Sequence, residues 1–445
     1  MIGKSVAELA CLLGGNSVSA LPISGFAVDS RKVAPGSIFF ALKGDKLDGH
    51  DFLSEVALQG AVAAVVSQEY QGEVDGLELI KVEDVLASLH KLAALQVKIK
   101  KMRCVAVTGS VGKTTTKEFI ATILEGAFSV GKTPGNANSQ VGLPLSLLNM
   151  TDAPDIFVAE LGMSQKGEIA ALLPIICPEI VVVTKVALAH ALYFPGGLEE
   201  VAEAKAEILG HPDTKKIFLN EQVASFAAFK QKQEVMPIFY GWGEEKEGKQ
   251  VSLLAKENSF VIKTEEGSSR EFTLPFSASH LGENFLAAAL VAKEFGMDLE
   301  SIIENAKKLT PYKMRFEKME KQGVFYINDS YNANPASMKA ALENLPKPHL
   351  GGKVIAVLGE MKELGIFTEK AHREMGEVAS LHANMLFCLG EQCVYMLEEF
   401  RKSGKTGFHY FSLDALQEDL KKYVNQGDVV LIKGSNSLKM WQLLS

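Results

Sequence analysis

The sequence predicts an α/β protein of several domains with parallel sheets. Apolar runs rich in β-branched residues alternate with helical stretches along almost the whole chain, which is typical of parallel α/β domains. The chain has 445 residues, more than one compact core normally organises, so roughly two to four domains are expected.

The expected strands are short apolar runs, and most of them end in Gly, Glu, Asn or Lys. Loops at the carboxyl ends of parallel strands commonly carry ligands, so these ends are the first places to look for a site. In chain order the runs cover residues 37–42, 61–66, 104–109, 155–161, 179–186, 216–220, 353–359, 384–390 and 428–434.

Three blocks follow from this pattern. Residues 1–84 hold short strands and form the first predicted domain. A helix expected over 84–101 leads into a larger central domain, 85–312, which contains a phosphate-loop motif. Residues 313–445 form a smaller α/β unit in which three strands are expected.

Composition limits the classes of function. The formal net charge is −8, so there is no basic surplus for general nucleic-acid binding. The five scattered cysteines predict buried free thiols and a reducing cytoplasm. Glu8 interrupts the N-terminal apolar run, and prolines and charges break the most apolar stretch, 169–194. We therefore expect a cytoplasmic protein with no membrane span.

The stretch CVAVTGSVGKTTTKEF, residues 104–119, resembles a phosphate loop of unusual length. The common pattern would need glycine at Val107, but here the loop is G-x-x-G-K-T and starts at Gly109. A strand precedes it, and a helix with Phe119 on its apolar face follows, so backbone N–H groups would point at an anion. Lys113 can then reach the outer phosphates and Thr114 can ligate magnesium. A threonine-rich turn without a ligand is the alternative.

Glu160 closes the apolar strand DIFVAEL. Magnesium prefers hard oxygen ligands, and a carboxylate at a strand end beside a phosphate loop suits it. By itself such a residue is as often simply solvated.

These motifs resemble the Mur ligase family, the ATP-dependent amide-forming enzymes of peptidoglycan synthesis, over essentially the whole chain. The matching elements are DSRKVAPGSIFFALKG and DGHDF, then GNANSQVGLPLSLL, AELGMSQKGEI, EAKAEIL and SHLGENFLAAALVA, and finally MRFE, NDSYNANPASMKAAL, VLGEMKELG and LIKGSNS. The resemblance implies a three-domain architecture with an N-terminal UDP-sugar-binding domain, a central P-loop ATPase-type parallel or mixed sheet, and a C-terminal Rossmann-like domain.

DSYNANPASMKAAL followed by VLGEMKELG is similar to the family member that adds D-Ala-D-Ala to UDP-MurNAc-tripeptide. This implies that ATP activates the tripeptide carboxylate as an acyl phosphate, which the dipeptide amine attacks through a tetrahedral intermediate. The family also suggests a monomer. Other readings stay open: a diaminopimelate- or lysine-adding ligase, a folylpolyglutamate synthetase-like ligase, or a non-enzymatic nucleotide-binding regulator.

The resemblance assigns roles to individual residues. Lys113, His190 and Lys205 would be catalytic, and Lys205 would be carbamylated by CO₂. Thr114, Glu160 and His190 would hold two magnesium ions. The ATP site would comprise Gly109, Ser110, Gly112, Lys113, Thr114, Thr115, Asn284 at adenine, Arg315 at phosphate and Asp329 at ribose. Substrate residues would be Ser30, Arg31, Asp48, Gly49, His50, Asn136, Asn138, Tyr331, Asn332, Asn334 and Ser337.

Blander interpretations exist for several of these residues. His190 in an apolar stretch suits a core histidine, and Lys205 suits a solvated helix face. Arg315 and Asp329 could form a surface salt bridge. Asparagine-rich turns before proline, such as 331–334, are often only turns.

The chain also departs from the family pattern. The unusual residues are Ser139, Ser164, Gln165, Lys185, Ala191, Leu192 and Asn436. Lys185 stands where asparagine is usual, and it would either place an extra cation near magnesium or point away from the site.

Overall fold

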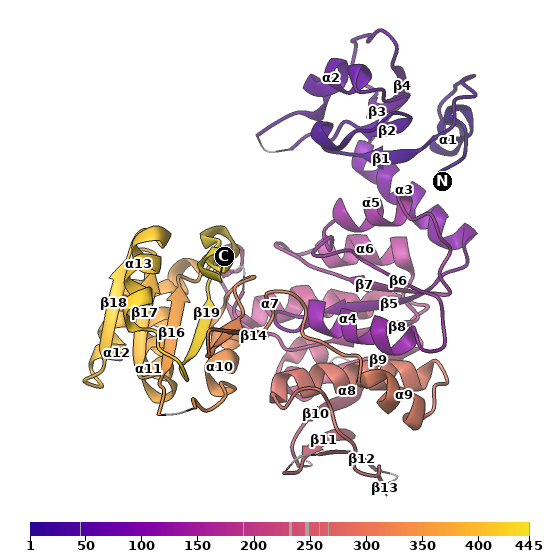
Figure 1. The fold of residues 1–445 in the computed structure, drawn as a ribbon. Helices are drawn as coiled ribbons and strands as arrows, with labels where there is room; N and C mark the ends of the chain where they lie inside the picture. The colour runs from indigo at the N-terminus through magenta and orange to yellow at the C-terminus, as the bar shows by residue number, and fades with distance from the viewer. Residues whose placement is uncertain are drawn as a thin grey trace.

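The computed structural model describes residues 1–44, 46–189, 191–230, 234–244, 249–257, 259–265, 267–349 and 351–444. Three sheets form three separate bodies (Figure 1). The N-terminal sheet lies at one end of the central sheet, and the C-terminal body lies beside the central one. The mixed α/β architecture expected from the sequence is confirmed.

Within the described residues the N-terminal sheet has four parallel strands in the order β1-β2-β3-β4. The helix α1 begins at a capping box formed by Ser5 and Glu8. The helix α3 has Asp84 as its N-cap and packs on helices of the central domain, so it joins the two bodies. The elements are α1 (Val6–Leu13), β1 (Gly25–Ala27), β2 (Ser37–Phe40), α2 (Leu53–Leu58), β3 (Ala63–Ser67), β4 (Glu78–Val82) and α3 (Val85–Ile99).

The central sheet has nine strands among the described residues, in the order β13-β12-β11-β10-β9-β8-β5-β7-β6. The strands from β6 to β11 are parallel, and β12 and β13 are antiparallel. The strands are β5 (Arg103–Thr108), β6 (Val130–Lys132), β7 (Ile156–Glu160), β8 (Ile180–Val183), β9 (Lys216–Asn220), β10 (Ile238–Trp242), β11 (Val251–Ala255), β12 (Phe260–Thr264) and β13 (Gly267–Ser268).

Helices cover both faces of this sheet. The helices α4 and α8 pack together and share one core with alternate residues of β5, β7 and β8, while α5, α6 and α7 share a second core with the intervening residues. The helices are α4 (Lys113–Leu124), α5 (Gly142–Leu148), α6 (Glu168–Ile176), α7 (Leu198–Ala206), α8 (Ser279–Glu294) and α9 (Leu299–Ala306). Phe119 is buried, as its helical spacing predicted.

The C-terminal sheet has the order β14-β15-β19-β16-β17-β18 in the described part of the chain, twice the three strands expected. The antiparallel strand β14 is mostly polar, which hid it from a search for apolar runs. The elements are β14 (Glu317–Lys321), β15 (Val324–Asn328), α10 (Pro335–Glu343), β16 (Val354–Gly359), α11 (Thr368–His382), β17 (Met385–Leu389), α12 (Cys393–Arg401), β18 (Thr406–Tyr410), α13 (Leu413–Tyr423) and β19 (Val429–Lys433).

All nine predicted strands exist, with ends that move by a few residues. The five cysteines are free, but Cys11 and Cys177 are exposed, so the expectation of burial was wrong for these two. Cys11 lies on the outer face of α1, and Cys177 caps α6 in a left-handed conformation. Among the described helices none is both long and apolar enough to cross a bilayer.

Candidate active site

The phosphate loop joins β5 to α4 at the carboxyl edge of the central sheet. A Cβ on Gly109 would lie 1.9 Å from the hydroxyl oxygen of Thr184, and Gly109 has φ +148°. A Cβ on Gly112 would lie 2.7 Å from Oδ1 of Asn284, and its φ is +91°. Both positions therefore require glycine, because there is neither space nor a suitable backbone conformation for a side chain. Thr114 and Thr115, in the first turn of α4, line a cavity that also contains Gly112 and Lys113 of the loop.

Lys113 is the first residue of α4, and its Nζ donates to the Gly109 carbonyl at 2.8 Å. Burial lowers the pKa of Lys113, while the nearby Glu160 carboxylate opposes that shift. The amine therefore lies between the loop and the strand that carries Glu160, where it can meet an anionic ligand.

Glu160 ends β7, next to the phosphate-loop strand, with Val107 as its register partner. Its side chain is only 2% exposed. One carboxylate oxygen accepts from the Asn138 amide at 2.8 Å. The other, Oε2, is buried with no hydrogen-bond partner among the described residues. A buried carboxylate oxygen without a partner is costly, so this oxygen suits an external ligand such as a cation.

Lys205, in the last turn of α7, is 2% exposed, so the solvated-face interpretation is wrong. Burial lowers its pKa well below the usual value, and the positive charge of Lys113 adds to the shift. It lines the same cavity as Glu160 and Asn138. A lowered pKa favours the neutral form of the amine, which is the nucleophilic form.

His190 lies outside the described residues. The short helix that follows, Ala191–Tyr193, contacts the C-terminal domain: the Leu192 N–H donates to the Glu363 carbonyl at 2.9 Å. The unusual pair Ala191-Leu192 therefore lies at the seam between the two domains.

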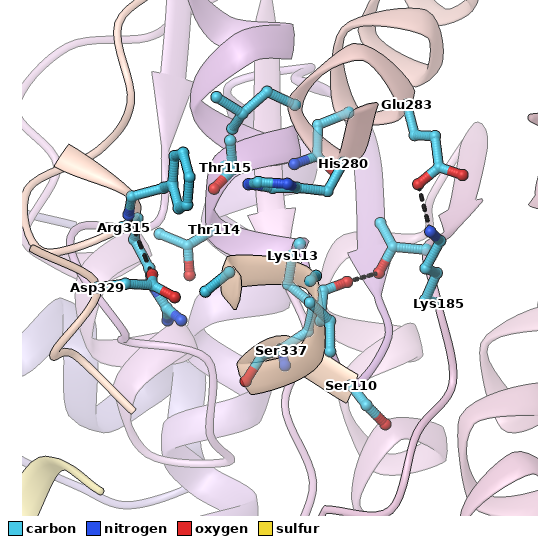
Figure 2. A pocket seen from close by; sticks show the side chains of 18 of the residues that line it. Ser110, Lys113, Thr114, Thr115, Lys185, His280, Glu283, Arg315, Asp329 and Ser337 are labelled. Atoms are coloured by element: carbon cyan, nitrogen blue, oxygen red, sulfur yellow. Dashed lines mark hydrogen bonds and ion pairs between the residues drawn. The ribbon is translucent and has the colours of Figure 1, made fainter. Parts of the chain in front are cut away.

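The far side of the nucleotide cavity comes from α8 and the C-terminal domain (Figure 2). Asn284 accepts a hydrogen bond from the Thr116 hydroxyl at 3.1 Å. His280 meets the Phe316 ring edge-on at a centroid distance of 5.0 Å. Burial lowers the pKa of His280 to about 4. The ring is therefore neutral near pH 7 and offers hydrogen bonds without adding charge.

Arg315 and Asp329 both line this cavity, but they do not form the salt bridge that was considered from the sequence. Arg315 lies over the Tyr331 ring at 4.1 Å, and its Nε has no partner in the described part of the chain. Asp329 accepts from the Phe316 N–H at 3.0 Å and pairs with the buried Lys433 at 2.6 Å. The Arg315 guanidinium is therefore available to an anion.

A second cavity continues from the phosphate loop into the C-terminal domain, and both cavities share Ser110, Lys113, Arg315 and Ser337. It brings together the predicted residues Asn136, Asn138, Glu160, Lys205, Tyr331, Asn332, Asn334 and Ser337. The turn interpretation of this asparagine-rich segment is also correct, because Asn334 and Ser337 form the capping box of α10.

Ser30, Arg31, Asp48, Gly49 and His50 line a separate cavity of the N-terminal domain. The ionisable side chains pair with near neighbours in sequence: Arg31 with Asp29 at 2.8 Å, and Asp48 with His50 at 2.6 Å. Val141 of the central domain also lines this cavity, which therefore extends toward the central body.

Sequence reasoning missed two buried lysines that shape the site. Lys433 ends β19 and holds Asp329, and Lys117 donates to the Thr133 and Gly135 carbonyls at 2.6 and 3.1 Å. Lys117 thereby fixes the segment that leads to Asn136. A strand ending in Lys-Gly was a visible signal for Lys433, whereas nothing marked Lys117 apart from its place on an otherwise apolar helix face.

The departures from the family pattern also have defined positions. Lys185 points toward α8 and pairs with Glu283. The backbone N–H groups of Ser164 and Gln165 donate to the Glu168 carboxylate. The Asn436 amide donates to the Tyr331 carbonyl at 2.9 Å, which links the segment after β19 to the predicted dipeptide segment.

The phosphate loop faces a second α/β domain across a polar cavity. This arrangement defines the class of enzymes that use a nucleotide and have their active site between two domains. Comparison with protein families matches residues 22–97 to "Mur ligase family, catalytic domain", 107–292 to "Mur ligase middle domain" and 314–436 to "Mur ligase, glutamate ligase domain". The chain belongs to the Mur ligase family, and it is an ATP-dependent ligase that forms an amide bond.

Individual relatives agree over the full length. The UDP-N-acetylmuramoyl-tripeptide–D-alanyl-D-alanine ligase of Bacillus subtilis is 31% identical, covering 100% of this chain and 98% of its own. A crystal structure of MurF from Acinetobacter baumannii has a TM-score of 0.86 at 28% identity, covering 100% of this chain and 98% of its own. MurF ligase from Thermotoga maritima in complex with ADP has a TM-score of 0.79 at 30% identity, covering 94% and 96%.

Proposed function

We propose that this chain adds D-Ala-D-Ala to UDP-MurNAc-tripeptide, with ATP as the energy source, and yields UDP-MurNAc-pentapeptide, ADP and phosphate. The relative from Bacillus subtilis that carries this name aligns with the whole chain at 31% identity. The observation that carries the proposal is one continuous cavity in which Lys113, Glu160 and Lys205 of the central domain face Tyr331 and Asn334 of the C-terminal domain.

ATP would bind in the cavity that begins at the phosphate loop. Gly109, Ser110, Gly112, Lys113, Thr114 and Thr115 would hold its phosphates, Asn284 the adenine, Arg315 a phosphate and Asp329 the ribose. Lys433 supports this role of Asp329, because their ion pair fixes the carboxylate within the cavity.

Magnesium fits this site. The unpartnered oxygen of Glu160 is a hard ligand in the cavity that also contains Lys113, the residue before Thr114. Magnesium commonly keeps phosphate and water ligands, so it needs few ligands from the chain itself. We assign Thr114 and Glu160 to one ion and His190 to a second, which a carbamylated Lys205 would support. Bound magnesium would neutralise phosphate charge.

The reaction needs two anions to meet. A carboxylate oxygen of the tripeptide attacks the γ-phosphorus, and the bond to the ADP oxygen breaks. The dipeptide amine then attacks the carbonyl carbon of the acyl phosphate, and the C–O bond to phosphate breaks as the amine proton passes to the leaving phosphate. Lys113 and Arg315 both line this cavity and would offset the approaching negative charges.

The remaining assignments follow the same scheme. Ser30, Arg31, Asp48, Gly49 and His50 would bind the uridine nucleotide, and Asn136, Asn138, Tyr331, Asn332, Asn334 and Ser337 would contact the peptide substrates. The proposed domains are 1–84, 85–312 and 313–445. We further propose that the enzyme acts as a cytoplasmic monomer.

The test is phosphate release from ATP with both substrates present and with each omitted in turn, with Lys113→Ala as control. Release should require both substrates, and mass spectrometry should find UDP-MurNAc-pentapeptide. Release with neither substrate, or ATP binding without pentapeptide, would contradict the proposal.

A further inference from the structure

The segment after β8 supports the phosphate loop through its backbone. The Lys185 carbonyl accepts from the Ser110 N–H at 2.7 Å and from the Val111 N–H at 3.4 Å. The Thr184 hydroxyl donates to the Val111 carbonyl at 2.7 Å. The first half of the loop is therefore held from the side of β8.

Helix α8 supports the second half of the same loop. The amide oxygen of Asn284 accepts from the Thr116 hydroxyl at 3.1 Å. The same oxygen fills the space that a Cβ on Gly112 would need. The loop therefore lies between two supports that are about a hundred residues apart in sequence but adjacent in space.

An ion pair joins these two supports. Lys185 Nζ lies 2.6 Å from Oε2 of Glu283, the residue that precedes Asn284. Glu283 is 9% and Lys185 39% exposed at the side chain. Figure 2 shows the pair on one side of the cavity, across from Arg315 and Asp329. A largely buried carboxylate requires a partner, so Glu283 is bound to the segment that carries Lys185.

We propose that Lys185 and Glu283 are positioning residues that fix the distance between the two supports and thereby shape the phosphate loop for a nucleoside diphosphate or triphosphate. This inference rests on the proposed function only in that the loop binds a nucleotide. It also gives the unusual Lys185 a role, because its side chain pairs with Glu283 of α8.

Two other roles for the pair make different predictions. If Lys185 acted as a cation that attracts phosphates, Glu283→Gln would strengthen ADP binding, because the competing carboxylate would be gone. If the pair contacted the base, both substitutions would weaken the binding of adenosine as much as the binding of ADP. Positioning of the loop predicts that both substitutions weaken the binding of ADP clearly more than the binding of adenosine.

The experiment measures binding of ADP and of adenosine to the full chain by calorimetry and ligand-observed NMR. The variants are Lys185→Met, Glu283→Gln, their double variant and the charge-swapped Lys185→Glu/Glu283→Lys. The matched control is Lys216→Met with Glu294→Gln. Lys216 is 40% exposed and pairs with the last residue of α8 at 3.3 Å, and it begins β9, away from the loop.

Each single substitution should weaken ADP binding about tenfold, and the double variant should be no weaker than either, because both changes remove one shared interaction. The charge swap should recover part of the loss, and the control should change ADP affinity less than about twofold. Unchanged ADP affinity in both single variants, opposite signs for the two, or an equal loss of adenosine binding would overturn the proposal.

The charge-swapped variant keeps the test decisive if a single variant fails to fold. Binding does not depend on the ligase reaction: a wild-type chain that binds ADP but forms no pentapeptide contradicts the proposed function and leaves this inference standing.

Discussion

Charged side chains have different surroundings in two cavities of the molecule. One cavity lies between the central and C-terminal domains, and the other lies in the N-terminal domain. In the first, Glu160 and Lys205 are buried, and one Glu160 oxygen has no partner among the described residues. In the second, Arg31 is 84% exposed and already paired with Asp29. The charged groups of the cavity between the domains are buried away from water, whereas Arg31 in the N-terminal cavity is exposed to water and paired with a neighbour in sequence.

The pKa directions reflect this contrast. Burial lowers the pKa values of Lys113 and Lys205. Hydrogen bonds from Arg31 lower the pKa of Asp29 to about 2. Desolvation dominates in the first region and local pairing in the second. Substitutions should therefore have large effects on chemistry between the domains and small effects on affinity in the N-terminal domain.

The largest effect is expected for Glu160→Gln. Loss of the buried carboxylate should lower kcat about a thousandfold, because it removes charge at the phosphate end of the site. The fold should lose some stability, since the variant lacks the carboxylate whose charge favours the protonated form of the buried Lys113. Phosphate release at saturating substrates and thermal unfolding measure the two quantities. A kcat within tenfold of wild type would contradict the role of Glu160.

Lys205→Met should lower kcat about a hundredfold by removing the amine that we assign to carbamylation. With ¹³C-labelled bicarbonate, wild type should give a carbamate NMR signal that the variant lacks. An identical spectrum in both would contradict carbamylation of Lys205.

The same residue predicts a pH effect on stability. Because the pKa of Lys205 is lowered in the folded chain, the unfolded chain binds this proton more tightly. Its contribution to stability therefore falls as the pH drops below the unfolded-state pKa, and becomes constant below the folded-state pKa. Lys205→Met should flatten this part of the stability profile measured by chemical unfolding without bicarbonate.

Much of the fold followed from the sequence because parallel strands buried on both faces are nearly continuous apolar runs. The strand pattern marked all nine predicted strands, but it passed over polar or short edge strands such as β14 and β18. The phosphate loop could also be recognised from the sequence, because the local backbone conformation and the lack of space for a side chain require Gly109 and Gly112.

The burial of Lys205 and the pairing of Lys433 with Asp329 could not be read from local pattern. Lys205 looks like a surface lysine because its helix is charged, and only packing against distant segments removes it from water. Likewise, Lys185 was recognisable as unusual, but its partner Glu283 lies on a helix remote in sequence. Pairings of this kind are set by tertiary structure, so the sequence indicates the residue and not the contact.

His280 provides a smaller test of desolvation between the domains. Burial lowers its pKa to about 4, whereas the ordinary value is 6.5. The unfolded chain therefore binds the proton first as the pH falls, and stability should drop by about 2 kcal/mol between about pH 7 and pH 5 from this group. His280→Leu should remove that part of the loss. Equal pH dependence of unfolding in variant and wild type would show that His280 is not desolvated.

The smallest effect is expected for Arg31→Ala in the N-terminal cavity. Arg31 is mostly exposed, and its interaction with an anionic uridine nucleotide would be screened by water and salt. We expect KM for UDP-MurNAc-tripeptide to rise about fivefold at low ionic strength, with less change at high salt, and kcat to stay constant. Asp29→Asn, which frees Arg31 from its pair, should lower the same KM. A fall in kcat for Arg31→Ala would mean that the N-terminal cavity influences the chemical step, and the contrast between the two regions would then fail.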